Sequence, residues 1–283
     1  MKGKYVGIYI DDNIITAVIM RIIKGVCRME DAITMSRSKS SGEDISSLIH
    51  RYSLEEEKIA IVGKTQVYIH GEFSKLQTKE EVRSMLEWHI DEYIPWDRNT
   101  YEFDFFLRTI DDKPYVYIVA VNKNDTNELI SGVTKGGGYI RIVDYYPAPL
   151  TYLYEKRTGL LLGIINGETN TIHFFAWWKG ACVAECEVAI DEEVLWKRLE
   201  EIEDTLAMFE NTTIEGVQLY GKEQLATEKA ILCDSIIELY GSITPVDIEI
   251  SDRAYELYKT GNLTWECAAG LCMRGLSYVN ITQ

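Results

Sequence analysis

The sequence has 283 residues, 46% hydrophobic and 26% charged, and its 29 Lys and Arg against 45 Asp and Glu give a net charge of −16. These proportions are typical of a folded globular protein and exclude a disordered or collagen-like chain. The acidity argues against nucleic-acid binding, which needs clustered cations, and against direct attachment to an anionic membrane surface.

Membrane-spanning and secretory signals are not expected in this chain. The most apolar early stretch, Ile14 to Ile23, is interrupted by Arg21 and is shorter than the roughly 20 residues that a spanning helix needs. The N-terminus runs straight into a strand-like segment without a signal-peptide pattern. The six Cys form no even framework and no Cys-x-x-Cys repeat, so we expect reduced thiols, no metal site and a cytoplasmic protein.

The first part of the chain has the pattern of an α/β unit. Its predicted elements are two strands, a third strand, an amphipathic helix and a buried strand, at residues 4–10, 14–20, 26–36, 44–52 and 58–62. The polar residues Asp11, Asp12 and Asn13 separate the first two strands and predict a hairpin turn. A pair of carboxylates at a hairpin tip is more typical of a solvated turn than of a metal site.

A small α+β module is predicted next. Thr78 and Glu81 form the capping box of a helix that continues at helical spacing until Pro95. A hairpin, a second helix and a strand follow, at residues 101–110, 115–122, 126–135 and 139–145. Three glycines, 136–138, end the second helix; they lack the Lys-Ser/Thr that follows a phosphate-binding loop.

The second half repeats the plan of the first. The predicted elements are a hairpin, a third strand, an acid-rich amphipathic helix, a buried strand and then helices around a short strand, at residues 160–166, 171–177, 181–189, 191–209, 217–220, 222–239, 244–250, 252–259 and 263–275. The repeat is one of architecture, not of sequence identity. Trp177 and Trp178 are adjacent in a strand, so we expect one ring to face outward as an interaction candidate.

Four segments resemble, in order and spacing, parts of the type IV pilus assembly proteins of the PilM family. They are GIYIDDNIITAV, MLEWHIDEYIPWDRNTYEFDF, YVYIVAVNKNDTNELISGVTKGGGYIRIVDYYPAPL and CAAGLCMRGL. The resemblance implies an actin-like α/β fold of the Hsp70/actin and FtsA/PilM type, with duplicated lobes and a small α+β module inserted in the first. It places the first lobe at 1–74, completed by 140–160, the module at 75–139, and a second lobe lacking the usual extra subdomain at 161–283.

The first phosphate hairpin departs from the pattern of actin-like ATPases. That pattern has an Asp that orients the metal and a Gly that lets backbone amides approach phosphate. In this chain Tyr9 and Asp11 occupy those positions, followed by Asp12 and Asn13. Two carboxylates at the turn would repel a phosphate group at close range.

The second hairpin and the adenosine-side loop also depart from the pattern. The hairpin turn reads Asn166-Gly167-Glu168, with no carboxylate before it, and the expected Gly pair is reduced to Gly221. We therefore predict a pseudo-ATPase with no catalytic residue, no metal and no cofactor, ATP with Mg being the disfavoured alternative.

The resemblance implies a structural adaptor, cytoplasmic and peripheral to the inner membrane through a partner. That partner is the N-terminal tail of a PilN-like bitopic membrane protein, with the pilus assembly motor as a further one. Tyr93, Ile94, Pro95 and Trp96 are the candidate partner-binding residues, although such a corner is also typical of a module core. The alternatives are an active nucleotide-dependent ATPase of the same fold and a GspL-like cytoplasmic component of type II secretion.

Overall fold

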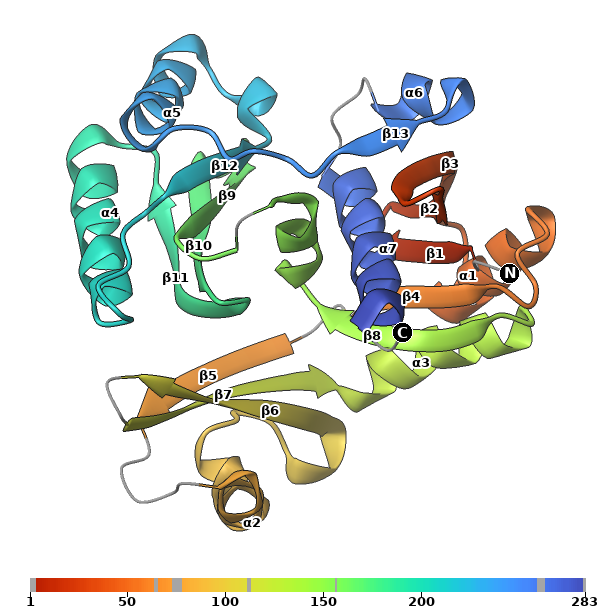
Figure 1. Cartoon of the computed structure of the whole chain (residues 1–283), viewed down its shortest axis with the longest axis horizontal. Helices are drawn as coiled ribbons and strands as arrows, with labels where there is room; N and C mark the ends of the chain where they lie inside the picture. The colour runs from red at the N-terminus through yellow and green to blue at the C-terminus, as the bar shows by residue number, and fades with distance from the viewer. Residues whose placement is uncertain are drawn as a thin grey trace. The chain divides into compact units, whose positions relative to one another are not determined.

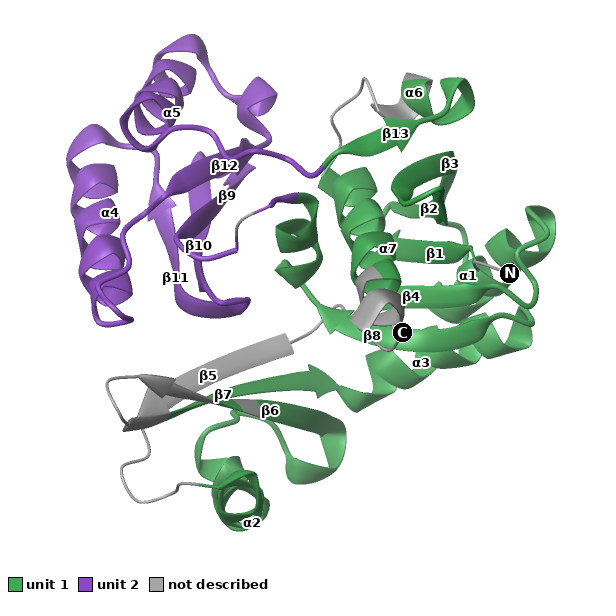
Figure 2. Cartoon of the chain, viewed as in Figure 1, with its two compact units in different colours: residues 1–109, 113–153, 247–283 green, residues 110–112, 154–246 purple. Residues whose placement is uncertain are grey.

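The protein consists of two compact units (Figure 2). A computed structural model describes residues 4–63, 66–72, 78–110, 113–155, 157–258 and 263–281. Unit 1 comprises residues 1–109, 113–153 and 247–283, and unit 2 comprises residues 110–112 and 154–246.

The elements of unit 1 are, in chain order (Figure 1), β1 (Tyr5–Ile10), β2 (Ile14–Ile23), β3 (Val26–Ser36), α1 (Ser41–Arg51), β4 (Lys58–Gly63), β5 (Gln66–Glu72), α2 (Lys79–His89), the 3-10 turns η1 (Ile90–Glu92) and η2 (Arg98–Thr100), β6 (Tyr101–Ile110), β7 (Lys113–Asn122), α3 (Lys123–Lys135), β8 (Tyr139–Tyr145), η3 (Ala148–Leu153), β13 (Ile248–Ile250), α6 (Asp252–Tyr258) and α7 (Leu263–Ile281).

The main sheet of unit 1 has the strand order β13-β3-β2-β1-β4-β8. Strands β1, β2 and β3 are antiparallel neighbours, whereas β4 runs parallel to β1 and β8 runs parallel to β4. Val6 and Ile8 of β1 share a buried cluster with Leu48 of α1 and Leu129 of α3. The opposite face of β1 packs against α7, which is the alternation expected of a strand covered on both sides.

Small residues allow α7 to approach the sheet closely. A Cβ on Gly7 would lie 1.9 Å from the carbonyl oxygen of Ala268, and a Cβ on Gly270 would lie 1.9 Å from that of Pro149. No side chain fits at such distances. The run Cys267 to Gly270 is therefore explained by packing of backbone against backbone.

A second, three-stranded sheet in unit 1 has the order β5-β7-β6. Helix α2 packs on it through Val82 and Leu86, which share a buried cluster with Tyr101 and Phe105 of β6 and Val116 of β7. Strand β5 was not expected from the sequence.

The elements of unit 2 are β9 (Leu160–Asn166), β10 (Thr171–Trp178), β11 (Ala181–Ala189), α4 (Glu192–Ala207), β12 (Gly216–Tyr220), η4 (Lys222–Gln224) and α5 (Thr227–Tyr240). Their sheet has the order β11-β10-β9-β12, in which β12 runs parallel to β9 and the other neighbours are antiparallel. This order matches β3-β2-β1-β4 of unit 1, and α4 occupies the same place in the chain as α1. The predicted duplication of architecture is thus confirmed.

The prediction that one tryptophan of the pair in β10 faces outward is wrong. Trp177 and Trp178 are 0% and 1% exposed. Trp177 pairs with Leu160 of β9, and the register of β10 against β11 shifts between Ala176 and Trp177. The ring of Trp178 lies at a tilt beside that of Phe209, with ring centroids 5.5 Å apart. Both rings are therefore part of the core of unit 2.

Two expected boundaries require correction. Residues 247–283, expected in the second lobe, belong to unit 1, because β13 pairs with β3 and α7 packs on β1 and β2. Helix α3, expected in the inserted module, packs on α1 instead, where a Cβ on Gly132 would lie 2.7 Å from the Cα of Gly42. In both cases the contacts join residues far apart in the chain, which no local pattern specifies.

Candidate functional site

The turn between β1 and β2 is closed by its own aspartate. The backbone N–H groups of Asn13 and Ile14 donate to Oδ1 of Asp11 at 2.7 and 2.8 Å, and the N–H of Asp11 donates to the carbonyl of Ile14 at 3.1 Å. This is an Asx turn, in which a side chain takes the place of an external acceptor. The amides of Asn13 and Ile14 therefore already have an acceptor within the turn.

Arg37 fastens this turn to α1. Its Nη1 donates to the carbonyl oxygen of Asp11 at 2.6 Å, and its Nη2 donates to Oγ of Ser41 at 3.0 Å. Its Nε lies 3.5 Å from Oδ2 of Asp44, whose side chain is 4% exposed. Arg37 and Asp44, called here the charged brace of the first turn, are therefore largely buried.

Tyr9 is half-buried in a mainly apolar environment. Its ring lies 6.2 Å from that of Tyr146 and packs against buried Val62 and Leu271. Burial raises the pKa of the phenol well above its usual range, and the nearby thiol of Cys267 and the acids of the turn raise it further. This environment favours the neutral form of the phenol, whereas divalent cations such as Mg²⁺ prefer carboxylate ligands.

The turn between β9 and β10 is closed in the same manner with neutral groups. The N–H groups of Glu168 and Thr169 donate to Oδ1 of Asn166 at 3.0 and 3.3 Å. The N–H of Gly167 donates to Oε1 of Gln224 at 3.3 Å. These three amides of the turn thus have acceptors from the chain itself.

Gly221 places Gln224 against this turn. Its φ of +84° is in the left-handed region, and a Cβ would lie 2.9 Å from the carbonyl of Ile165, so glycine suits both the conformation and the space. The N–H of Gln224 donates to the carbonyl of Gly221 at 3.0 Å. Within unit 2, the structure therefore brings together Asn166, Gly167 and Gly221.

The predicted nucleotide-site residues divide between the units. Tyr9, Asp11, Asp12 and Asn13 are consecutive or nearly so in unit 1, and the others form one end of the sheet in unit 2. In the part of the chain that the structure describes, no three His, Cys, Asp or Glu side chains gather into a group that could hold a metal ion.

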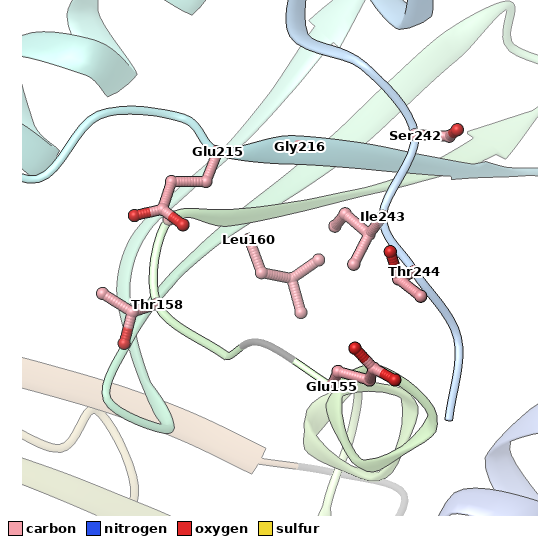
Figure 3. Close-up of a pocket in the computed structure, with 9 residues that line it drawn as sticks. Glu155, Thr158, Leu160, Glu215, Gly216, Ser242, Ile243 and Thr244 are labelled. Atoms are coloured by element: carbon pink, nitrogen blue, oxygen red, sulfur yellow. The ribbon is translucent and has the colours of Figure 1, made fainter. Parts of the chain in front are cut away.

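A pocket in unit 2 lies away from the turn (Figure 3). It has a volume of about 130 Å³ and is lined by Glu155, Thr158, Gly159, Leu160, Glu215, Gly216, Ser242, Ile243 and Thr244. Leu160 and Gly216 are the first residues of β9 and β12, whereas Asn166 is the last residue of β9. The length of β9, about 20 Å, separates the pocket from the closed turn.

The partner-binding candidates have different environments. Ile94 is 2% exposed and belongs to the buried cluster beneath α2, and Trp96 is half-buried against the same cluster, 6.5 Å from the ring of Tyr101. Tyr93 and Pro95 are exposed. Ile94 is thus a core residue, and a binding role for the corner stays a prediction.

Sequence reasoning missed the most exposed large apolar side chain of the described residues, Trp88, which is 82% exposed. The prediction for this helix gave its capping box and its end at Pro95, and it did not single out Trp88. Helical spacing alone could have predicted the exposure of Trp88, because Trp88 lies on the helix face opposite the buried Leu86.

No family model matches the sequence, and no curated protein is similar enough in sequence to match it. Solved structures do match. The "PilM-PilN type IV pilus biogenesis complex" matches with a TM-score of 0.66 and 12% identity, covering 98% of this chain and 99% of that chain. The cytoplasmic domain of EpsL, described as an inner membrane component of the type II secretion system of Vibrio cholerae, matches with a TM-score of 0.52 and 10% identity over 95% of this chain and 94% of that chain.

A protein of unknown function with an actin-like ATPase fold, from Bacteroides thetaiotaomicron, matches more distantly, with a TM-score of 0.46 and 12% identity over 94% of this chain and 95% of that chain. The actin-like fold predicted from the resemblance to the PilM family is confirmed, by the full-length similarity to the first two structures and by the duplicated strand order.

No helix within the described ranges is long and apolar enough to cross a membrane.

Proposed function

We propose that this protein is a cytoplasmic adaptor of a type IV pilus or related secretion machine, of the PilM type, and that it does not hydrolyse ATP. The observation that carries the proposal is the closure of both hairpin turns by side chains of the chain itself. Phosphoryl transfer depends on donors and a metal preorganised around phosphate. In this protein the amides of Asn13, Ile14, Gly167, Glu168 and Thr169 already have acceptors, and the residue expected at the metal-orienting position is Tyr9.

The proposed partner is the N-terminal cytoplasmic tail of a PilN-like bitopic inner-membrane protein, with the pilus assembly motor as a further partner. The fold shared with the PilM–PilN complex over the whole chain supports this choice. A net charge of −16 also favours attachment to a membrane through a protein partner, because anionic lipids would repel the chain.

The test is fluorescence polarisation of a labelled N-terminal tail peptide from a PilN-like bitopic protein of the same organism. The wild type should bind it, and Trp96→Ala should weaken binding by roughly 1–3 kcal/mol, the range for an aromatic hot spot. Since Trp96 also packs on the core of its module, a melting curve must accompany each variant. Tyr93→Ala, at an exposed position of the same corner, provides a variant that leaves the core intact.

Binding of no tail peptide by the wild type would overturn the adaptor proposal. Unchanged affinity in folded Trp96→Ala and Tyr93→Ala variants would remove the corner from the binding site and leave the adaptor role standing.

A second candidate is a cytoplasmic component of type II secretion, of the GspL kind. The similarity to the cytoplasmic domain of EpsL over nearly the whole chain favours it. Pull-down with the membrane partners of each system separates the two candidates, since each predicts retention of one set and not the other.

A further inference from the structure

Three sulfur-containing side chains from different elements meet in unit 1. Sγ of Cys27, near the start of β3, lies 3.2 Å from Sδ of Met273 in α7 and 4.0 Å from Sδ of Met20 in β2. Cys27 pairs with Ile22 of β2, and Ile22 shares a strand face with Met20. Helix α7 packs against β2, so two strands and a helix together hold the three sulfur atoms.

These three side chains lie at the boundary between the core and the surface. Met20 is fully buried, whereas Cys27 and Met273 are half-buried. Lys24 and Gly25, in the turn that joins β2 to β3 just before Cys27, are exposed. The group of sulfur atoms thus extends from the core toward solvent.

The environment of Cys27 suits a metal ligand better than a redox thiol. Burial raises the pKa of the Cys27 thiol to about 11. At neutral pH the thiol is therefore protonated, and a protonated thiol is a weak nucleophile in disulfide exchange. A metal ion with high affinity for sulfur displaces the proton and binds the thiolate.

The distances between the sulfur atoms suit a three-coordinate ion. Metal–sulfur bonds are about 2.3 Å long, so two sulfur ligands at about 120° around one ion lie about 4 Å apart. Cys27 and Met20 already have this separation. Sδ of Met273 has to move away from Cys27 by less than about 1 Å, which the flexible, unbranched Met side chain allows.

We propose that Cys27, Met20 and Met273, called here the sulfur cluster, bind one Cu(I) ion. Thiolate and thioether ligands are soft and select Cu(I), whereas magnesium and calcium take oxygen ligands. A structural zinc site needs four ligands of the Cys or His type, and the sulfur cluster contains one. On binding, the S–H bond of Cys27 breaks, its proton goes to solvent, and Sγ bonds to the copper, which stays in the +1 state.

The sulfur cluster lies outside the features considered so far. The expectation of no metal site rested on the spacing of the cysteines, and spacing cannot reveal one Cys and two Met brought together from positions 20, 27 and 273. The proposal goes beyond the adaptor function, because the sulfur cluster includes no residue of the hairpin turns or of the corner at 93–96.

The test is competition for Cu(I) between the full chain and the chromophoric chelator bicinchoninate, in ascorbate and without oxygen. The wild type should bind one Cu(I) tightly, and X-ray absorption should show sulfur ligands at about 2.3 Å. Cys27→Ser should weaken the affinity by about 100-fold or more, since it removes the one anionic ligand of the sulfur cluster. Met20→Leu and Met273→Leu, which nearly conserve side-chain volume, should each weaken it by about ten-fold.

Matched variants separate the sulfur cluster from the other sulfur atoms of the chain. Cys186 is half-buried like Cys27 but lies in unit 2, and Met208 is 62% exposed. Cys186→Ser and Met208→Leu should keep the wild-type affinity for Cu(I). Zn²⁺, measured with a zinc-chelating dye, should bind no more tightly to the wild type than to Cys27→Ser.

A melting curve provides a second readout and a check of folding. Cu(I) should raise the melting temperature of the wild type but not that of Cys27→Ser, because a ligand that binds the folded state stabilises it. Curves without copper show which variants fold. If Met20→Leu does not fold, Met273→Leu, at a half-buried position, still tests the thioether ligands.

Three results would overturn the proposal. They are failure of the wild type to take Cu(I) from the chelator, equal losses of affinity in Cys27→Ser and Cys186→Ser, and wild-type affinity in every folded Met20→Leu or Met273→Leu variant. Tighter binding of Zn²⁺ to the wild type than to Cys27→Ser would contradict the assignment to a soft ion. The adaptor role is tested separately, because Cys27→Ser should bind the membrane-protein tail as the wild type does.

Discussion

The two hairpin turns of this protein reach the same end by different chemistry. In unit 1 the carboxylate of Asp11 accepts from the turn amides, and the guanidinium of Arg37 donates to the backbone carbonyl of Asp11. In unit 2 the neutral side chains of Asn166 and Gln224 accept from the turn amides. The turns share no sequence, yet in each a side-chain oxygen accepts from two backbone amides of the turn. The comparison teaches that short polar side chains of different charge can close a hairpin turn in the same way.

The largest effect should come from the charged brace of unit 1. Arg37→Ala removes the cation beside the nearly buried Asp44, whose carboxylate would keep only the backbone N–H groups of Ser38 and Lys39. The free energy of unfolding should fall by about 3 kcal/mol, as for a broken buried ion pair. Urea denaturation followed by circular dichroism measures the change. Arg37→Lys keeps the charge without the forked donors and should restore part of the loss. A decrease of less than about 1 kcal/mol in the free energy of unfolding of Arg37→Ala would show that Arg37 and Asp44 contribute no more than an exposed ion pair.

Gly221→Ala tests the backbone that positions Gln224 against the turn between β9 and β10. The left-handed backbone alone should cost about 1–2 kcal/mol, and the close approach to the Ile165 carbonyl should add to it. Gly180→Ala is the matched control, because Gly180 has a φ of +82° and open space around it. Equal losses in the two variants, by urea denaturation, would mean that the Gly221 loop does not rest on β9.

The side chains that close the turns should contribute less. Asp11→Ala and Asn166→Ala should each lower the free energy of unfolding by about 1 kcal/mol, since each leaves two turn amides without their acceptor. Asp11→Asn and Asn166→Asp keep the acceptor oxygen and should stay near wild type. If the conservative variants lose as much as the alanine variants, Oδ1 is not what closes the turns.

Gln224→Ala should have the smallest effect. It removes one acceptor, that of the exposed Gly167 amide, so the free energy of unfolding should fall by no more than about 0.5 kcal/mol. Hydrogen exchange is the sensitive readout: the Gly167 amide should exchange faster while those of Glu168 and Thr169 do not. Uniformly faster exchange along the turn would indicate that Gln224 holds the whole turn.

Local patterns predicted most elements of both units and the duplicated plan, because alternation, capping and turn residues act over a few positions. The capping box of Thr78 and Glu81, for example, is present as predicted. What failed depended on contacts distant in sequence: the packing of α7 on β1, the position of α3, and the burial of Trp178 against Phe209. The closure of the turns by Asp11 and Asn166 was not predicted either, since a carboxylate at a turn was judged by its charge and not by its local hydrogen bonds.

The most direct test of the account is titration of the full chain with Mg-ATP, followed through the backbone amide signals of Asn13, Ile14, Glu168 and Thr169 in a nitrogen–proton correlation spectrum. These four amides donate to Asp11 and Asn166 in the structure. The account predicts that none of their signals moves at millimolar Mg-ATP and that no phosphate is released. Saturable shifts of these amides at micromolar nucleotide, with hydrolysis, would contradict it and identify the protein as an active ATPase of the actin-like fold.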